Sequence, residues 1–174
     1  MDWQPRLARE GDIPQLEALI SVSIKRLQVH HYSRAQMEAA LGSVFGVDRQ
    51  LIRDETYFVV EREGQIIGCG RWSKRKTLFG GDAIKTRMDM ELDLKRDSAR
   101  SLVHPAWARY GIARTILERC EKAIRLAGFR DVELVATLTG ELFYEASCYS
   151  QGVRFEIPLA NGLSLPVVRM VKQL

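Results

Sequence analysis

Cysteine is scarce in this sequence of 174 residues, and long apolar runs are missing from it. The three cysteines, Cys69, Cys120 and Cys148, have no paired spacing, which argues against a disulfide framework or a zinc knuckle and favours a reducing cytoplasm. No apolar run approaches the roughly 18 residues that span a bilayer, and the polar start MDWQPRLARE is unlike a signal peptide. We therefore expect a cytoplasmic protein with no membrane partner and no bound metal.

A strong charge of one sign is missing as well. The formal net charge is only +4, and the arginines are scattered along the chain. The one dense basic cluster, RWSKRK at residues 71–76, contains a single aromatic side chain, Trp72. A solvated strand end explains this cluster better than a basic RNA-binding domain, whose binding would weaken steeply with salt. We expect no nucleic-acid partner.

The composition that remains, 46% apolar and 28% charged residues, is that of an ordinary globular protein. Its length predicts one domain over residues 1–174. Hydrophobic periodicity and turn residues predict strands and helices in alternation. The expected strands are 3–8, 57–60, 65–72, 99–105, 131–137, 153–159 and 165–174, and the expected helices are 13–27, 34–41, 48–53, 109–127 and 140–147.

This order predicts an α/β fold, with one mixed sheet and helices on both of its faces. The apolar run at residues 131–137 is expected to be central and parallel to the strand before it. Gly68 and Gly70 indicate a bulge or a close backbone approach inside their strand. Residues 74–99 mix glycine and charge, and we expect a loop there.

An apolar strand is joined to a long helix by the turn at residues 108–113, which has the sequence ARYGIA. The start of a helix leaves amide groups unpaired and carries partial positive charge, so it can bind an anion. Gly111 and Ala113 are small enough to let a phosphate approach the backbone, and Arg109 and Arg114 add charge. The three spaced glycines of a dinucleotide-binding turn and the Gly-Lys-Ser/Thr of a P-loop are both absent.

The segment 103–117 resembles motif A of the GNAT superfamily of N-acetyltransferases, which runs Q/R-x-x-G-x-G/A and binds the pyrophosphate of acetyl-CoA. Gly111 and Ala113 match its small residues, while Ala108 stands at the Q/R position. The stretch ATLTGELFYEASCYS resembles motif B, with Tyr144 on the motif's tyrosine and Thr137 and Cys148 at positions usually held by asparagine and glycine. The order of elements also matches this superfamily.

The resemblance implies a GNAT-type fold and transfer of an acetyl group from acetyl-CoA to a primary amine, on a small molecule or a peptide. It also implies a homodimer, since members often pair through their C-terminal strands. It implies that the backbone of residues 102–104 polarises the thioester carbonyl and that Tyr144 gives a proton to the leaving thiol. The expected cofactor-binding residues are Leu102, Val103, His104, Arg109, Tyr110, Gly111, Ile112, Ala113, Arg114 and Thr137.

Two questions stay open at this stage. The general base is either a side chain or a chain of waters, and the candidate side chains are Glu91, Asp93 and His104. Glu133, in the strand at residues 131–137, and Glu141, after it, are either part of the acceptor channel or part of a solvated face. The departures from the motifs at Ala108 and Cys148 also fit a second class of function, a non-catalytic acyl-CoA sensor on the same fold.

Overall fold

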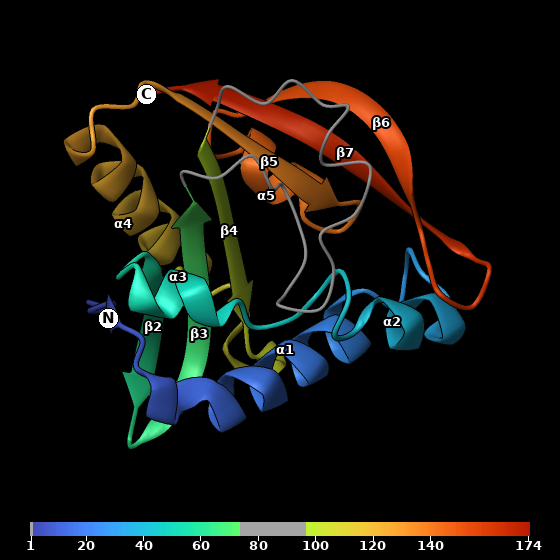
Figure 1. Ribbon diagram of the computed structural model, residues 1–174, viewed down its shortest axis with the longest axis horizontal. Helices are drawn as coiled ribbons and strands as arrows, with labels where there is room; N and C mark the ends of the chain where they lie inside the picture. Colours follow the sequence, from blue (N-terminus) through green and yellow to red (C-terminus); the bar gives the residue numbers. More distant parts are fainter. Residues whose placement is uncertain (1, 74–96) are drawn as a thin grey trace.

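The computed structural model describes residues 2–73 and 97–174. Within them, seven strands form one sheet in the order β1-β2-β3-β4-β5-β7-β6 (Figure 1). The strands are β1 (Arg6–Leu7), β2 (Tyr57–Arg62), β3 (Gln65–Ser73), β4 (Asp97–Val103), β5 (Asp131–Thr137), β6 (Ser150–Pro158) and β7 (Ser164–Gln173). All neighbours are antiparallel except β4 and β5, which are parallel as the sequence predicts.

Helices cover both faces of this sheet, which confirms the predicted mixed α/β architecture (Figure 1). On one face, α1 (Ile13–Leu27) and α2 (Arg34–Ala40) pack their apolar stripes against the sheet. On the other face lies α4 (Ile112–Leu126), whose buried side chains include Ile112 and Ile116. Two five-residue helices, α3 (Arg49–Arg53) and α5 (Glu141–Glu145), complete the set together with the 3₁₀ turns η1 (Glu10–Asp12) and η3 (Pro105–Trp107).

Several element ends differ from the sequence prediction, each for a local reason. The long helix begins at Ile112 rather than at Arg109, because Arg109 and Gly111 both have positive φ angles, of 70° and 83°. The first strand is only Arg6–Leu7, since only these residues pair with β2. Strands β4 and β6 begin earlier than predicted, at Asp97 and Ser150. The predicted loop over residues 74–99 lies outside the described residues except for its last three.

The two glycines of β3 are sites of close approach, and the register shift in this hairpin lies instead between Val60 and Glu61 of β2. A Cβ on Gly68 would lie 2.5 Å from Ile112 Cγ2. A Cβ on Gly70 would lie 2.2 Å from Ile116 Cγ2 and 2.7 Å from the carbonyl oxygen of Arg100. The absence of side chains here therefore lets α4 lie directly on β3, which fixes where the N-terminus of α4 meets β4.

We predict that Gly70→Ala destabilises the fold by roughly 1–3 kcal/mol, because the methyl group would overlap both a core side chain and a strand carbonyl that cannot move aside. Gly11→Ala is the matched control, since a Cβ there meets nothing within 4 Å. Urea unfolding followed by circular dichroism measures both variants. Equal midpoints for the two would contradict this account of how α4 is placed.

Candidate active site

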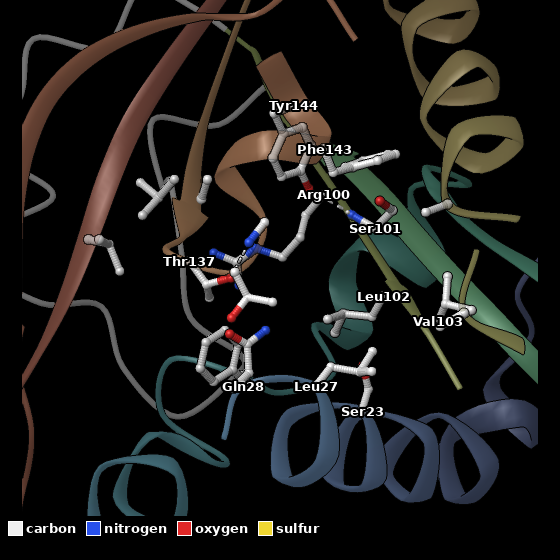
Figure 2. A pocket seen from close by; sticks show the side chains of 18 of the residues that line it. Ser23, Leu27, Gln28, Arg100, Ser101, Leu102, Val103, Thr137, Phe143 and Tyr144 are labelled. Atoms are coloured by element: carbon white, nitrogen blue, oxygen red, sulfur yellow. Dashed lines mark hydrogen bonds between the residues drawn. The ribbon is translucent and has the colours of Figure 1, made fainter. Parts of the chain in front are cut away.

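Strands β4 and β5 are neighbours over only two residue pairs, Asp97 with Val132 and Ser98 with Glu133. Beyond these pairs the strands separate, and β5 continues to Thr137 paired with β7 alone. A cavity of about 190 Å³ lies at this opening, between the two strands, the C-terminal half of α1 and the start of α4 (Figure 2). Its walls include residues of β4, β5 and α5, so segments far apart in the sequence meet there.

The backbone of β4 presents amide groups to this opening. The amide of His104 donates to the carbonyl oxygen of Ile67 on β3, at 2.8 Å. Because amides alternate in direction along an antiparallel strand, those of Ser101 and Val103 point away from β3 and toward the gap. The amide of Ser101 donates to the Tyr144 hydroxyl at 3.4 Å. This hydroxyl is the acceptor that a carbonyl of β5 would be if the two strands were paired here. By the same alternation, the amide of Val103 points into the gap between β4 and β5.

The turn before α4 adds a second group of amides. Gly111 is the N-cap residue of this helix, and its side chain can provide no cap, so the amides of the first turn face outward. A Cβ on Gly111 would meet nothing within 4 Å, which means that the space in front of the turn is open. The indole of Trp3 donates to the carbonyl oxygen of Tyr110 at 2.8 Å and holds the turn from behind.

The predicted cofactor-binding residues gather at this corner, although they do not all face the cavity. The Tyr110 side chain is 57% exposed and packs edge-on against Trp107, while Gly111 and Arg114 lie on the outer side of the turn. His104 is also outside the cavity wall. The predicted site residues that do line the cavity are Leu102, Val103, Arg109, Ile112, Ala113 and Thr137, together with Tyr144.

Tyr144 is held in one orientation by its surroundings. Its ring is 5% exposed and packs edge-on against Phe143 and Tyr149, with centroid separations of 5.0 and 5.6 Å. Burial raises the pKa of the phenol, and the hydrogen bond from Ser101 and the charge of Arg100 oppose that effect. The phenol is therefore protonated at neutral pH, with its hydroxyl at the gap between β4 and β5 (Figure 2).

His104, one of the candidates for a base, and the two glutamates expected near the acceptor channel have other partners. The Nδ1 atom of His104 accepts from the amide of Ala106 at 3.2 Å, which makes this histidine the cap of η3. Glu133 is fully buried and forms an ion pair with Arg169 at 2.6 Å, and Glu141 pairs with Arg154. The other two candidates, Glu91 and Asp93, lie outside the described residues.

The cavity also contains polar side chains that the sequence analysis missed. Arg100 projects from β4 into it, on the same strand face as Leu102, and Ser23 and Gln28 reach it from α1 and its C-cap (Figure 2). Alternation along residues 100–103 could have shown that Arg100 and Leu102 share a face. Nothing in the sequence shows that this face opens to a cavity.

Two searches of the residues that the structure describes gave a negative result. No group of three or more His, Cys, Asp or Glu side chains is arranged to hold a metal ion within residues 2–73 and 97–174. No helix among those residues has both the length and the apolar character that crossing a membrane requires.

The fold has counterparts among known structures. A GCN5-related N-acetyltransferase from Rhodopseudomonas palustris superposes with a TM-score of 0.75 at 18% identity, covering 100% of this chain and 97% of that one. A PaiA N-acetyltransferase from Thermoplasma acidophilum, solved with coenzyme A, gives a TM-score of 0.64 at 14% identity and full coverage of both chains. A phosphinothricin acetyltransferase from Sinorhizobium meliloti, solved with acetyl-CoA, gives 0.65 at 17% identity, covering 100% of this chain and 89% of that one.

At these identities the superpositions establish the fold. A search of curated proteins by sequence found no match. The sequence model of the acetyltransferase (GNAT) domain, however, matches residues 53–147, which is more than half of the chain and includes β4, the turn, α4 and Tyr144. The chain therefore belongs to the GNAT family and is an acetyl-CoA-dependent acyltransferase.

Proposed function

We propose that this enzyme transfers an acetyl group from acetyl-CoA to a primary amine by direct attack of the amine nitrogen. The observation that carries the proposal is the opening between β4 and β5, which has outward amides at one end and a protonated phenol inside. The acceptor is a small molecule or a peptide, and Tyr144 is the catalytic residue.

The residues at the opening fit acetyl-CoA. The diphosphate would lie against the amides of residues 111–114 at the start of α4, where the space before Gly111 is open and Arg109 and Arg114 add positive charge. The pantetheine arm, which carries its own amide groups, would lie between the strands. It would form hydrogen bonds with backbone groups of β4 and β5 that do not pair with each other. An unsatisfied buried amide costs about 1–3 kcal/mol, so a ligand that pairs with these groups is favoured.

The chemistry that acetyl-CoA supplies is a thioester, whose acyl carbon accepts the amine nitrogen as the carbon–sulfur bond breaks. The Val103 amide would donate to the carbonyl oxygen and stabilise the negative charge that develops on it. Tyr144 would donate its hydroxyl proton toward the departing sulfur, since its buried phenol is protonated at neutral pH. The acceptor ammonium gives up a proton before attack, and we assign no side chain to that step.

Replacing Gly111 with valine tests the phosphate turn. The new side chain would cover the amides of the first turn and weaken coenzyme A binding about tenfold or more, which corresponds to at least about 1.4 kcal/mol. Gly128→Val is the matched control, because Gly128 has a similar positive φ, of 90°, and open space, but lies at the other end of α4. Isothermal titration calorimetry with coenzyme A measures both, and equal dissociation constants would contradict the assignment.

Replacing Tyr144 with phenylalanine tests the proton donor. We expect kcat to fall about a hundredfold or more, the usual contribution of a positioned acid, with coenzyme A affinity retained. Tyr149→Phe is the control, since Tyr149 is also buried but bonds to Glu121 away from the cavity. Thiol release from acetyl-CoA measures the rates. An unchanged kcat in the Tyr144 variant would remove its proposed role.

Replacing His104 with alanine tests whether this histidine is the base. Its Nδ1 atom is occupied as a cap, so we expect the pH profile of kcat/KM to keep both of its limbs. The cost is confined to stability, about 0.5–2 kcal/mol for the lost cap. Loss of the acidic limb in this variant would show that His104 accepts the proton after all.

A further inference from the structure

Arg100 is the feature of the cavity that acetyl transfer itself does not explain. Its side chain leaves β4 on the face toward α1, opposite to the face that carries Val103 and α4 (Figure 2). The guanidinium lies near the ring of Phe45, 5.7 Å from its centroid, and its Nη1 donates to the carbonyl oxygen of Val44 at 3.3 Å. The charge therefore lies on the side of the split sheet away from the turn that would hold the diphosphate.

The positive charge of Arg100 has no counterion among the described residues. No Asp or Glu side chain of residues 2–73 and 100–174 forms an ion pair with it, and its one hydrogen bond there is to the neutral carbonyl of Val44. Burial and the nearby charge of Arg71 lower the pKa of the guanidinium, to about 10, so it remains protonated at neutral pH. Arg100 is half-buried. A partly desolvated charge without a carboxylate partner among the described residues is costly, and an anionic ligand would remove that cost.

Other polar atoms of the same cavity also lack partners within the described residues. Ser23 and Gln28 are 1% and 6% exposed, and the Oγ of the first and the Oε1 of the second have no hydrogen bond there. Both belong to the segment that forms the wall of the cavity on the α1 side. An amide oxygen, such as Oε1 of Gln28, accepts hydrogen bonds from an amine. This wall can therefore bind the amine of a ligand whose anionic group pairs with Arg100.

Apart from the hydroxyls of Ser101, Thr137 and Thr139, the rest of this part of the cavity is apolar. Its walls are aliphatic and aromatic side chains from several elements, which offer no group to a second charge. They are Leu27, Val44, Phe45, Ile157 and Val167. The positive charges of a polyamine would be repelled by Arg100 and would find no partner on the apolar walls. A ligand with a carboxylate and an apolar side chain would pair the first with Arg100 and pack the second against the walls.

We propose that the acetyl acceptor is a small amino acid with an apolar side chain, whose carboxylate pairs with Arg100 while its amine faces the thioester. This inference rests on the proposed amine acetylation and names its substrate class. The nitrogen forms a bond to the acyl carbon, the carbon–sulfur bond breaks, and the sulfur leaves as the thiol of coenzyme A after taking a proton. The product is an N-acetylamino acid, which keeps its carboxylate.

The test compares acceptors that differ only in the carboxylate. Thiol release from acetyl-CoA is measured with L-leucine, L-leucinamide and isoamylamine, and with L-methionine and L-methioninamide. We expect kcat/KM to be about 10- to 100-fold higher for each acid than for its amide, the usual value of a charged hydrogen bond. Equal values, or a preference for the amides, for isoamylamine or for a polyamine such as spermidine, would overturn the inference.

A variant assigns the preference to Arg100. Arg100→Gln should raise KM for L-leucine about tenfold or more, change the value for L-leucinamide less than about twofold, and leave coenzyme A affinity as it was. Arg154→Gln is the control, because Arg154 pairs with Glu141 and is not part of the cavity wall. Weaker coenzyme A binding with an unchanged preference would assign Arg100 to the cofactor and overturn the inference.

The wild-type comparison decides the matter even if Arg100→Gln does not fold. The outcomes also separate this inference from the proposed function. Thiol release that ignores the carboxylate refutes only the amino acid acceptor. Binding of coenzyme A without thiol release from any of these amines, from spermidine or from a panel of peptides with free N-termini refutes both.

Discussion

The separation of β4 from β5 is the constraint on which the rest of the site depends. Two neighbouring parallel strands normally pair along their length, and here they pair only at Asp97 with Val132 and at Ser98 with Glu133. Their remaining backbone groups must find other partners, because buried amides and carbonyls without hydrogen bonds are costly. Tyr144 supplies one partner, to Ser101, and the proposed coenzyme would supply others. The fold thus offers unpaired backbone groups with which an extended ligand could form hydrogen bonds.

In this arrangement the backbone of β4 faces the proposed coenzyme, and some of its side chains face the proposed acceptor. On β4, the amides of Ser101 and Val103 point into the gap, while the side chains of Arg100 and Leu102 point toward α1. The proposed coenzyme contacts use the backbone, which any sequence of this fold can present. The proposed acceptor contacts use the side chain of Arg100 and the wall on the α1 side, so they can change from one relative to another while the transfer chemistry stays the same.

The sequence predicts the elements whose signals are local. The periodic stripes of α1 and α4 and the parallel pair around α4 are found where expected. The glycine pair in β3 also signals the close approach of α4 correctly. These features depend on residues close together in the chain, or on glycines inside a strand, which indicate a bulge or a close approach.

The parts that the sequence does not predict depend on distant contacts. The environment of Arg100 comes from Val44 and Phe45, more than fifty residues earlier, and the capping role of His104 depends on the turn that follows it. The start of α4 moved by three residues because the backbone at Arg109 has a positive φ that its sequence does not signal. The general base stays unassigned, and the homodimer and the cytoplasmic location stay predictions.

Amide hydrogen exchange, measured residue by residue by NMR with and without coenzyme A, tests the central claim most directly. The account predicts that saturating coenzyme A slows exchange at Val103 and at the first-turn amides Ile112, Ala113 and Arg114 more than at His104, which is already bonded to β3. Unchanged exchange at Val103 and at the start of α4 in the bound protein, with protection elsewhere, would contradict it.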